Sequence, residues 1–115
     1  MTVDELFEKG FAARCDGRYG EAKLFFMAVL AQDPAHAQAQ WQQGLIQGFE
    51  GDFDASYETL LRLSNQHPAN NDLRYDLAMT MMMLAMNDEA CAEFQRILDN
   101  DPTHEKANQQ IVYCP

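Results

Sequence analysis

Proline returns at a fixed interval of 34 residues along this chain, as Pro34, Pro68 and Pro102. Six other sets of positions keep similar residues at the same interval: Gly10/Gly44/Ala78, Gly17/Gly51/Ala85, Tyr19/Phe53/Asn87, Ala22/Ser56/Ala90, Phe26/Leu60/Phe94 and Val29/Leu63/Ile97. A period of this length is typical of stacked structural repeats. We therefore expect three copies of one unit, residues 3–36, 37–70 and 71–104, followed by a remnant at 105–115.

Each unit has the pattern of a helical hairpin. Apolar residues in the first unit recur at helical spacing, as Ala22, Phe26, Val29 and Leu30. Gly17 and Gly51 lie mid-unit, where glycine can take the left-handed conformation that ends a helix. The proline at the end of each unit cannot continue a helix, because it lacks an N–H and clashes with the preceding turn. Thr2 and Glu5 form a capping-box pattern at the N-terminus.

Side-chain sizes that recur from one unit to the next predict how the helices pack. Small side chains at Gly10, Gly44 and Ala78, and at Ala22, Ser56 and Ala90, would let helix axes approach closely, and large ones would fill the space beside them. A single hairpin cannot bury both of its faces, so the last one needs a cap. We expect residues 104–113 to form that cap, with Ala107, Ile111 and Val112 as its apolar stripe.

This arrangement resembles the tetratricopeptide repeat family over residues 3–104. The resemblance implies an all-α, right-handed superhelical solenoid of three antiparallel helical hairpins with a short C-terminal cap, all in one domain, residues 1–115. Some positions depart from the family pattern, and there we expect softer packing without loss of the period: Lys9, Gln40, Gln43, Arg74, Ala85 and Asn87.

A groove on the concave side is the candidate functional site. The resemblance implies that first helices line this face and hold a peptide there. Independently, apolar residues recur at i, i+4 and i+8 in each first helix: Phe7, Phe11, Cys15; Trp41, Leu45, Phe49; Tyr75, Met79, Met83. Aromatic and methionine side chains are typical of protein-binding surfaces. The candidate groove residues are Phe7, Phe11, Trp41, Leu45, Phe49, Tyr75, Met79, Met82, Met83 and Tyr113, with an acidic rim of Asp4, Asp72 and Asp76.

Two interpretations of this stripe remain open. In the first, Phe7, Trp41 and Tyr75 form a ladder of partly exposed rings across the three first helices. In the second, the same residues are ordinary core, which is the usual meaning of an aromatic stripe at helical spacing. Full burial of Trp41 would favour the second interpretation.

The charge balance restricts the class of partner. Eight Lys and Arg against eighteen Asp and Glu give a formal net charge of −10. Nucleic acid and anionic lipid both require a basic surface, so neither is an expected partner. Some members of the family that the chain resembles are co-chaperones, which bind a chaperone's C-terminal carboxylate through cations and amides. The matching positions here hold no cation and two anions, which excludes that ligand: Phe7, Phe11, Gln42, Asp72 and Asp76.

Cysteine and histidine suggest no chemistry. Cys15, Cys91 and Cys114 are odd in number and lack metal or redox spacing, so we expect reduced, mostly buried thiols in a cytoplasmic protein, with Cys114 a candidate surface thiol. Three histidines lie within two residues of a proline and belong in loops, with no shared metal site expected: His36, His67 and His104. No catalytic motif or cofactor-binding loop is present.

The sequence therefore predicts a non-enzymatic protein-interaction module without a cofactor, serving as an adaptor, scaffold or chaperone-like protein. Its expected ligand is a protein or peptide segment with apolar anchors and flanking basic residues. We expect a monomer or a weak homodimer. The alternatives are a structural solenoid that dimerises through the stripe, a piece of a longer repeat array and, least favoured, an enzyme.

Overall fold

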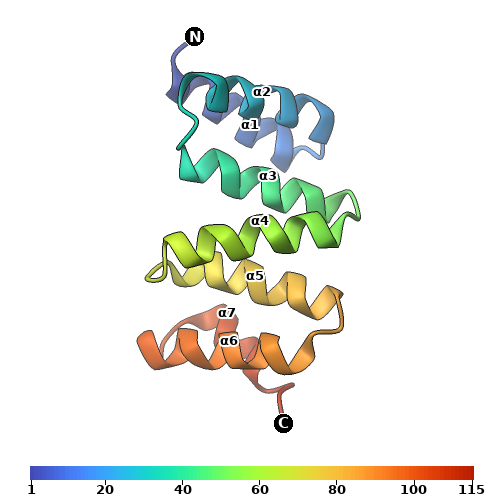
Figure 1. The fold of residues 1–115 in the computed structure, drawn as a ribbon, viewed down its shortest axis with the longest axis vertical. Helices are drawn as coiled ribbons and strands as arrows, with labels where there is room; N and C mark the ends of the chain where they lie inside the picture. The colour runs from blue at the N-terminus through green and yellow to red at the C-terminus, as the bar shows by residue number, and fades with distance from the viewer.

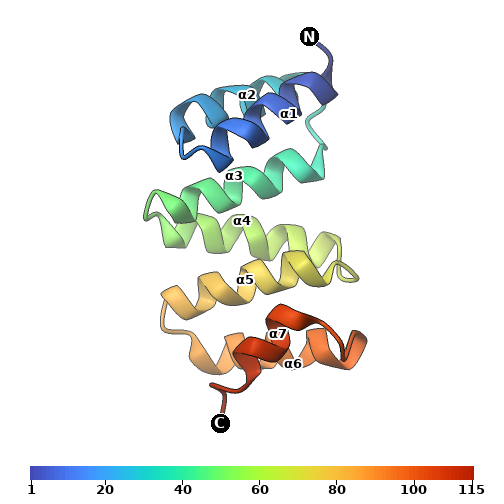
Figure 2. The ribbon, with the colours of Figure 1, turned by 180° about the vertical axis from the view of Figure 1, so that it is seen from behind.

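The computed structural model describes residues 1–115 as seven α-helices and no strands. They are α1 (Val3–Cys15), α2 (Tyr19–Gln32), α3 (Ala37–Phe49), α4 (Phe53–Gln66), α5 (Asn71–Met83), α6 (Asn87–Asn100) and α7 (Glu105–Ile111). The helices stack along the long axis of a molecule measuring 47 × 26 × 22 Å, and the termini lie at opposite ends (Figure 1). From behind, α1 lies in front of α2 and α7 in front of α6 (Figure 2). The fold is an all-α helical repeat solenoid.

The first helix of each hairpin is followed, two residues after its end, by a residue with positive φ. Gly17 has φ 78°, Gly51 has φ 90° and Ala85 has φ 59°. Glycine takes this left-handed conformation without steric cost, whereas a Cβ atom is strained there. The third hairpin therefore keeps the turn of the other two although it has no glycine at this position.

Side chains from the loops begin the next first helices. His36 Nδ1 accepts a hydrogen bond from the Ala39 N–H at 3.0 Å, and His104 Nδ1 accepts one from the Ala107 N–H at 3.1 Å. Asn70 occupies the equivalent position before α5 and accepts from the third helical N–H in the same way. Such bonds satisfy backbone donors that a helix leaves free at its start. Two of the loop histidines are thus helix N-caps, a role that proximity to proline did not predict.

The capping box at the N-terminus is confirmed. The Thr2 hydroxyl accepts a hydrogen bond from the Glu5 N–H at 3.1 Å, and the Glu5 carboxylate accepts one from the Thr2 N–H in return.

Two departures from the repeat pattern have a structural role. The Gln40 amide donates to the Pro34 carbonyl at 2.8 Å, and the Arg74 guanidinium donates to the Pro68 carbonyl at 2.9 Å. In the cap, Asn108 makes the same bond to Pro102, again 34 residues further on. These polar side chains tie each first helix to the loop before it. At Gln40 and Arg74 the departures thus supply hydrogen bonds that the family pattern did not predict.

Small residues allow the two helices of a hairpin to touch. Ala22 and Ala90 are fully buried, and a Cβ atom added at Gly10 would lie 2.8 Å from the Phe26 ring. In the second hairpin the Ser56 hydroxyl donates to the Gly44 carbonyl at 2.8 Å. The large side chains beside these contacts form the core, and none of them is more than 1% exposed: Phe26, Leu60, Phe94, Val29, Leu63 and Ile97.

The terminal helix α7 covers the last hairpin, but its stripe is shorter than predicted. Ala107 is fully buried and Ile111 packs against the core. Val112 is exposed, so its predicted place in the stripe is wrong. Val112 keeps helical backbone angles at the C-cap (φ −63°, ψ −20°), but five residues after Ala107 it lies about 140° further around the helix and so points away from the core.

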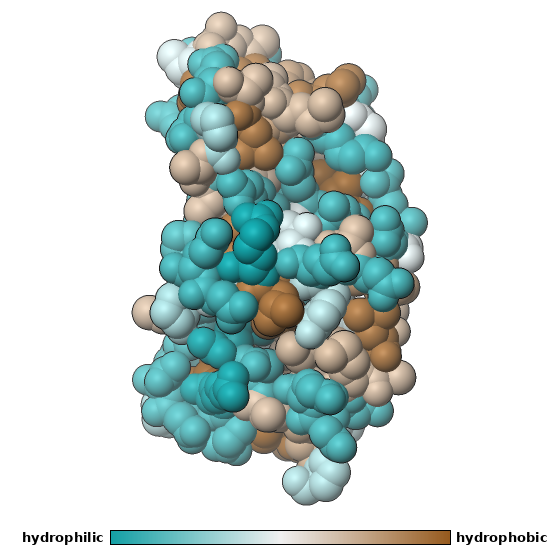
Figure 3. Space-filling model, in the orientation of Figure 1, coloured by the Kyte–Doolittle hydropathy of each residue, from teal (hydrophilic) through white to brown (hydrophobic).

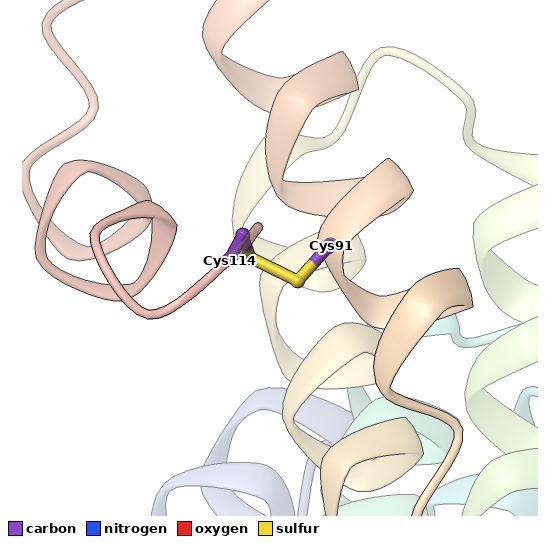
Figure 4. Close-up of a disulfide and its surroundings, with 2 residues drawn as sticks. All are labelled: Cys91 and Cys114. Carbon is purple, nitrogen blue, oxygen red and sulfur yellow. A yellow bond between two sulfur atoms is a disulfide. The ribbon is translucent and has the colours of Figure 1, made fainter.

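A disulfide joins Cys91 on α6 to Cys114 beyond α7 (Figure 4). Their Cα atoms are 5.8 Å apart, and 23 residues separate them in the sequence. The expectation of reduced, mostly buried thiols is therefore wrong for this pair. It is also wrong for Cys15, which is free but exposed. The disulfide arises because the chain reverses at α7 and returns to α6, which cysteine spacing alone did not reveal.

The outer face of α2 is unusually apolar. Leu24 is 67% exposed and Met27 is 59% exposed, whereas the residues equivalent to Leu24 on α4 and α6 are Glu58 and Ala92. Figure 3 shows tan and brown surface gathered at the end of the stack formed by α1 and α2. None of the helices combines the length and the apolar character needed to cross a bilayer.

Candidate partner-binding groove

A groove with a volume of about 700 Å³ runs across the faces of α3 and α5. The ends of α1, α4 and α7 complete its walls. Its lining consists of Arg14; Trp41, Gln42, Leu45, Gly48 and Phe49; Phe53 and Ser56; Asp72, Tyr75, Asp76, Met79, Thr80 and Met83; and Lys106.

Helical spacing explains why the apolar walls are continuous. Residues four apart on a helix share a face, so α3 and α5 each turn three apolar side chains into the groove. Six predicted site residues are brought together in this way: Trp41, Leu45, Phe49, Tyr75, Met79 and Met83. Phe49 is 52% exposed and Met83 is 61% exposed, while Trp41 and Tyr75 are half-buried. The walls are thus open to a ligand along much of their length.

The predicted ladder of three rings does not include Phe7. The Phe7 ring lies 5.6 Å from that of Phe26 and 5.4 Å from that of His36, outside the groove. Tyr75 makes the equivalent contacts 68 residues later, with Phe94 and His104. Phe7 and Tyr75 thus occupy equivalent places on their helices, and they differ because the groove includes only Arg14 from α1. Phe11 also lies outside the groove lining, although it is partly exposed.

The structure places Met82 and Tyr113 elsewhere. Both line a smaller hollow of about 320 Å³ beside the disulfide, and Tyr113 is 78% exposed. Tyr113 follows the end of α7, so it cannot occupy the helical position that the repeat assigned to it. Asp4 is exposed in the first turn of α1, away from the groove lining.

Asp76 lies in the groove wall and not on its rim. The Trp41 indole Nε1–H donates to Asp76 Oδ2 at 2.8 Å, and the carboxylate is half-buried. Burial raises the pKa of Asp76 above its ordinary 3.8, because the charged form loses water; the bond from Trp41 acts in the opposite direction.

The neighbours of Asp76 on α5 differ from it in exposure. Asp72 is exposed, as predicted for a rim, and its Oδ1 lies 2.9 Å from His104 Nε2. Burial raises the pKa of the Tyr75 hydroxyl, and the nearby Asp76 charge adds to this shift. The residues of the chain include no group of three or more His, Cys, Asp or Glu side chains placed to hold a metal ion.

Comparisons with known proteins agree on the fold. Residues 72–104, which lie within the third predicted unit (71–104), match the family described as Tetratricopeptide repeat. These residues therefore form a tetratricopeptide repeat. No curated protein matches its sequence.

Three solved structures illustrate the similarity of the fold to those of known proteins. MamA (residues 41 to the end) from Desulfovibrio magneticus RS-1 has a TM-score of 0.84 at 21% identity, over 97% of this chain and 63% of that one. The Arabidopsis OM64 TPR domain has a TM-score of 0.81 at 18% identity, over 93% and 88%. The first TPR of Spaghetti (RPAP3), bound to the HSP90 peptide SRMEEVD, has a TM-score of 0.85 at 16% identity, over 96% and 88%.

Identities this low show a common fold and nothing further. The chain spans 62% of the length of the first MamA structure that it matches.

The structure adds polar residues to the groove that the residues predicted from the sequence did not include. Arg14 lies 5.0 Å from the centre of the Phe11 ring and 5.8 Å from that of Phe49. Lys106 Nζ lies 5.7 Å from the centre of the Tyr75 ring. Gln42 is only 6% exposed, and its Oε1 has no hydrogen-bond partner. Gln42 could have been predicted as a groove residue from the sequence, because it matches a ligand-binding position of the family. Lys106 could not, since it reaches the groove only because α7 folds back.

Proposed function

We propose that the groove binds a segment of a partner protein that carries apolar anchor side chains and nearby basic residues. One observation carries this proposal: a groove of about 700 Å³ whose two apolar walls include the exposed Phe49 and Met83. Exposed apolar surface of this kind marks interaction sites in many proteins, and aromatic side chains are their usual anchors. The activity is binding without catalysis.

The RPAP3 structure supports this use of the fold, since it holds a peptide. That peptide, SRMEEVD, is acidic at its C-terminal end. The groove described above instead presents Asp72 and Asp76, and these carboxylates would repel such an end. Arg14 and Lys106 line the groove as well, so the preference for lysine or arginine rests on complementarity to the two carboxylates on α5 and not on the net charge of the lining.

Adaptor, scaffold and chaperone-like roles all fit such a module. The Cys91–Cys114 disulfide bears on its location, because reducing compartments such as the cytoplasm keep cysteines as thiols. In a cytoplasmic setting this pair would be reduced, and in an oxidising compartment it would hold α7 against α6.

A selection from a displayed library of random 12-residue peptides tests the proposal. The wild type should enrich peptides with apolar residues at fixed spacing. Trp41→Ala should weaken a selected peptide by about 2 kcal/mol, as for a central aromatic anchor, measured by calorimetry. Leu24→Ala is the matched control, because it truncates an exposed apolar side chain outside the groove and should leave affinity unchanged.

Two results would contradict the proposal. One is that the wild type enriches no peptide family. The other is that Trp41→Ala destabilises the fold by the roughly 3–5 kcal/mol typical of a core aromatic. That loss would assign Trp41 to the core and not to a binding surface.

Self-association is the second candidate function, favoured by the exposed Leu24 and Met27 on α2. Sedimentation over a range of concentrations tests it. A dimer that Leu24→Glu abolishes would identify the α2 face as the interface, whereas one that Trp41→Ala abolishes would show that the groove binds a second copy. A monomer at every concentration rules out both.

A further inference from the structure

We propose that the groove seats one cationic side chain of the bound segment, a lysine or an arginine, against Asp76 and Gln42. This inference rests on the proposed function. It goes beyond that proposal by placing the basic residue inside the groove, between the apolar anchors, and by naming the residues that receive it.

Asp76 has less compensation than a half-buried carboxylate requires. Its only side-chain hydrogen bond comes from the Trp41 indole, at 2.8 Å, and it takes part in none of the ion pairs of the chain. A carboxylate can accept several hydrogen bonds, and its removal from water is costly without an opposite charge. The two cations that line the groove, Arg14 and Lys106, lie over aromatic rings; their charges act to lower the pKa of Asp76, but neither forms an ion pair with it. Asp76 is thus free to receive a cation from outside.

Gln42 supplies independent support. It follows Trp41 on α3 and lines the same groove as Asp76. Its side chain is more than nine-tenths buried, yet Oε1 has no donor. Buried acceptors without a partner are rare in native proteins, because leaving one unpaired costs stability. The Oε1 atom is itself buried, so a ligand donor would satisfy it once the Gln42 side chain turns toward the groove.

The chemistry of these groups selects a cation. Asp76 and Gln42 Oε1 are acceptors, and the exposed Asp72 lies one helical turn from Asp76 on the same face of α5. An ammonium or guanidinium group offers several donors and no acceptor. A neutral hydroxyl or amide could satisfy Gln42 but would leave the Asp76 charge without a counterion.

The aromatic walls favour the same ligand. Cations bind over the faces of Trp and Tyr rings, and Lys106 Nζ already lies 5.7 Å from the centre of the Tyr75 ring. The alkyl part of a lysine or arginine side chain can pack along apolar surface while its charged end makes polar contacts. Such a side chain therefore matches both the methionine-lined walls and the carboxylate between them.

The experiment uses the same random 12-residue library with three proteins: wild type, Asp76→Asn and Gln42→Glu. The wild type should enrich lysine or arginine at one position fixed relative to the apolar anchors. Asp76→Asn keeps an acceptor for the Trp41 N–H but loses the charge, so that position should lose its basic preference while the anchors persist. Gln42→Glu adds negative charge at the unpaired acceptor and should keep or strengthen the preference. Circular dichroism melting checks that each variant folds.

A thermodynamic cycle on one selected peptide makes the test quantitative. Replacing its basic residue by norleucine, which keeps the alkyl chain, should weaken binding to the wild type at least about tenfold, as for bonds to charged groups. The same replacement should have little effect on Asp76→Asn. Each affinity is measured by calorimetry at one fixed salt concentration.

The outcomes separate the inference from the proposed function. Apolar peptides without a fixed basic residue, or an unchanged basic preference in Asp76→Asn, would overturn the inference and leave the groove as a binding site. A weaker preference in Gln42→Glu would also overturn it, because the amide would then be acting as a donor. Failure of the wild type to select any peptide would overturn both.

Discussion

Trp41 and Asp76 are joined across the groove by an indole hydrogen bond of 2.8 Å, although 35 residues separate them in the sequence. The bond fixes the orientation of the only tryptophan and links α3 to α5. It also holds a carboxylate where burial outweighs the stabilising effect of the indole, so that the pKa of Asp76 is raised. Asp76 thus belongs to the proposed binding surface, and its charge also lowers the stability of the folded state.

Stability should depend on pH through Asp76. Its folded pKa is above the ordinary 3.8, so protonation favours the folded state. That stabilisation is fully present below pH 3.8 and is lost as pH rises through the raised folded pKa. Asp76→Asn removes the charge and keeps an acceptor for Trp41, so it should unfold at a higher temperature than the wild type at pH 7. The advantage should shrink as the pH falls, and a constant difference at every pH would contradict this account.

Replacing Ala85 by glycine should stabilise the folded state. Its φ of 59° is strained for any residue with a Cβ atom, and the equivalent residues of the other hairpins are glycines. Ala85→Gly should raise the free energy of unfolding by about 0.5–1 kcal/mol, measured by urea denaturation. Gly17→Ala is the matched reverse change: a Cβ there has nothing within 4 Å, so any loss comes from the backbone. If both changes were neutral, strain at the turn would not matter.

The small-residue column should reject larger side chains. Ala90 is fully buried in α6, where it belongs to the cluster that includes Phe94. Ala90→Leu should lower the free energy of unfolding by roughly 1–3 kcal/mol through overpacking. Ala92→Leu is a suitable control on the same helix, because Ala92 is exposed. Equal stability of both variants would place this column on the surface.

The disulfide should stabilise the C-terminal end of the solenoid. A bond that closes a loop of 23 residues restricts the unfolded chain, and such bonds typically contribute about 2–4 kcal/mol. Cys114→Ser should therefore lower the free energy of unfolding by about this amount and speed amide exchange in α7. Cys15→Ser should change neither, because that thiol is free and exposed. Normal protection of α7 in Cys114→Ser would show that packing of Ala107 and Ile111 is sufficient.

Features that repeat locally were predictable from the sequence. Helix ends at Gly17 and Gly51, the capping box at Thr2 and the buried column containing Ala22 and Ala90 depend on residues close along the chain or on the 34-residue period. Six groove residues on α3 and α5 were also predictable, because spacing along one helix decides which side chains share a face.

Tertiary structure decided what depends on contacts between distant residues. Phe7 and Tyr75 make equivalent ring contacts, with Phe26 and Phe94, yet only Tyr75 lines the groove, where Trp41 bonds to Asp76. The return of the chain through α7 brings Lys106 to the groove and Cys114 to Cys91. Periodicity specifies the face of a helix that a residue occupies, whereas the partner it meets there, and hence its charge state and exposure, follow only from how the helices stack.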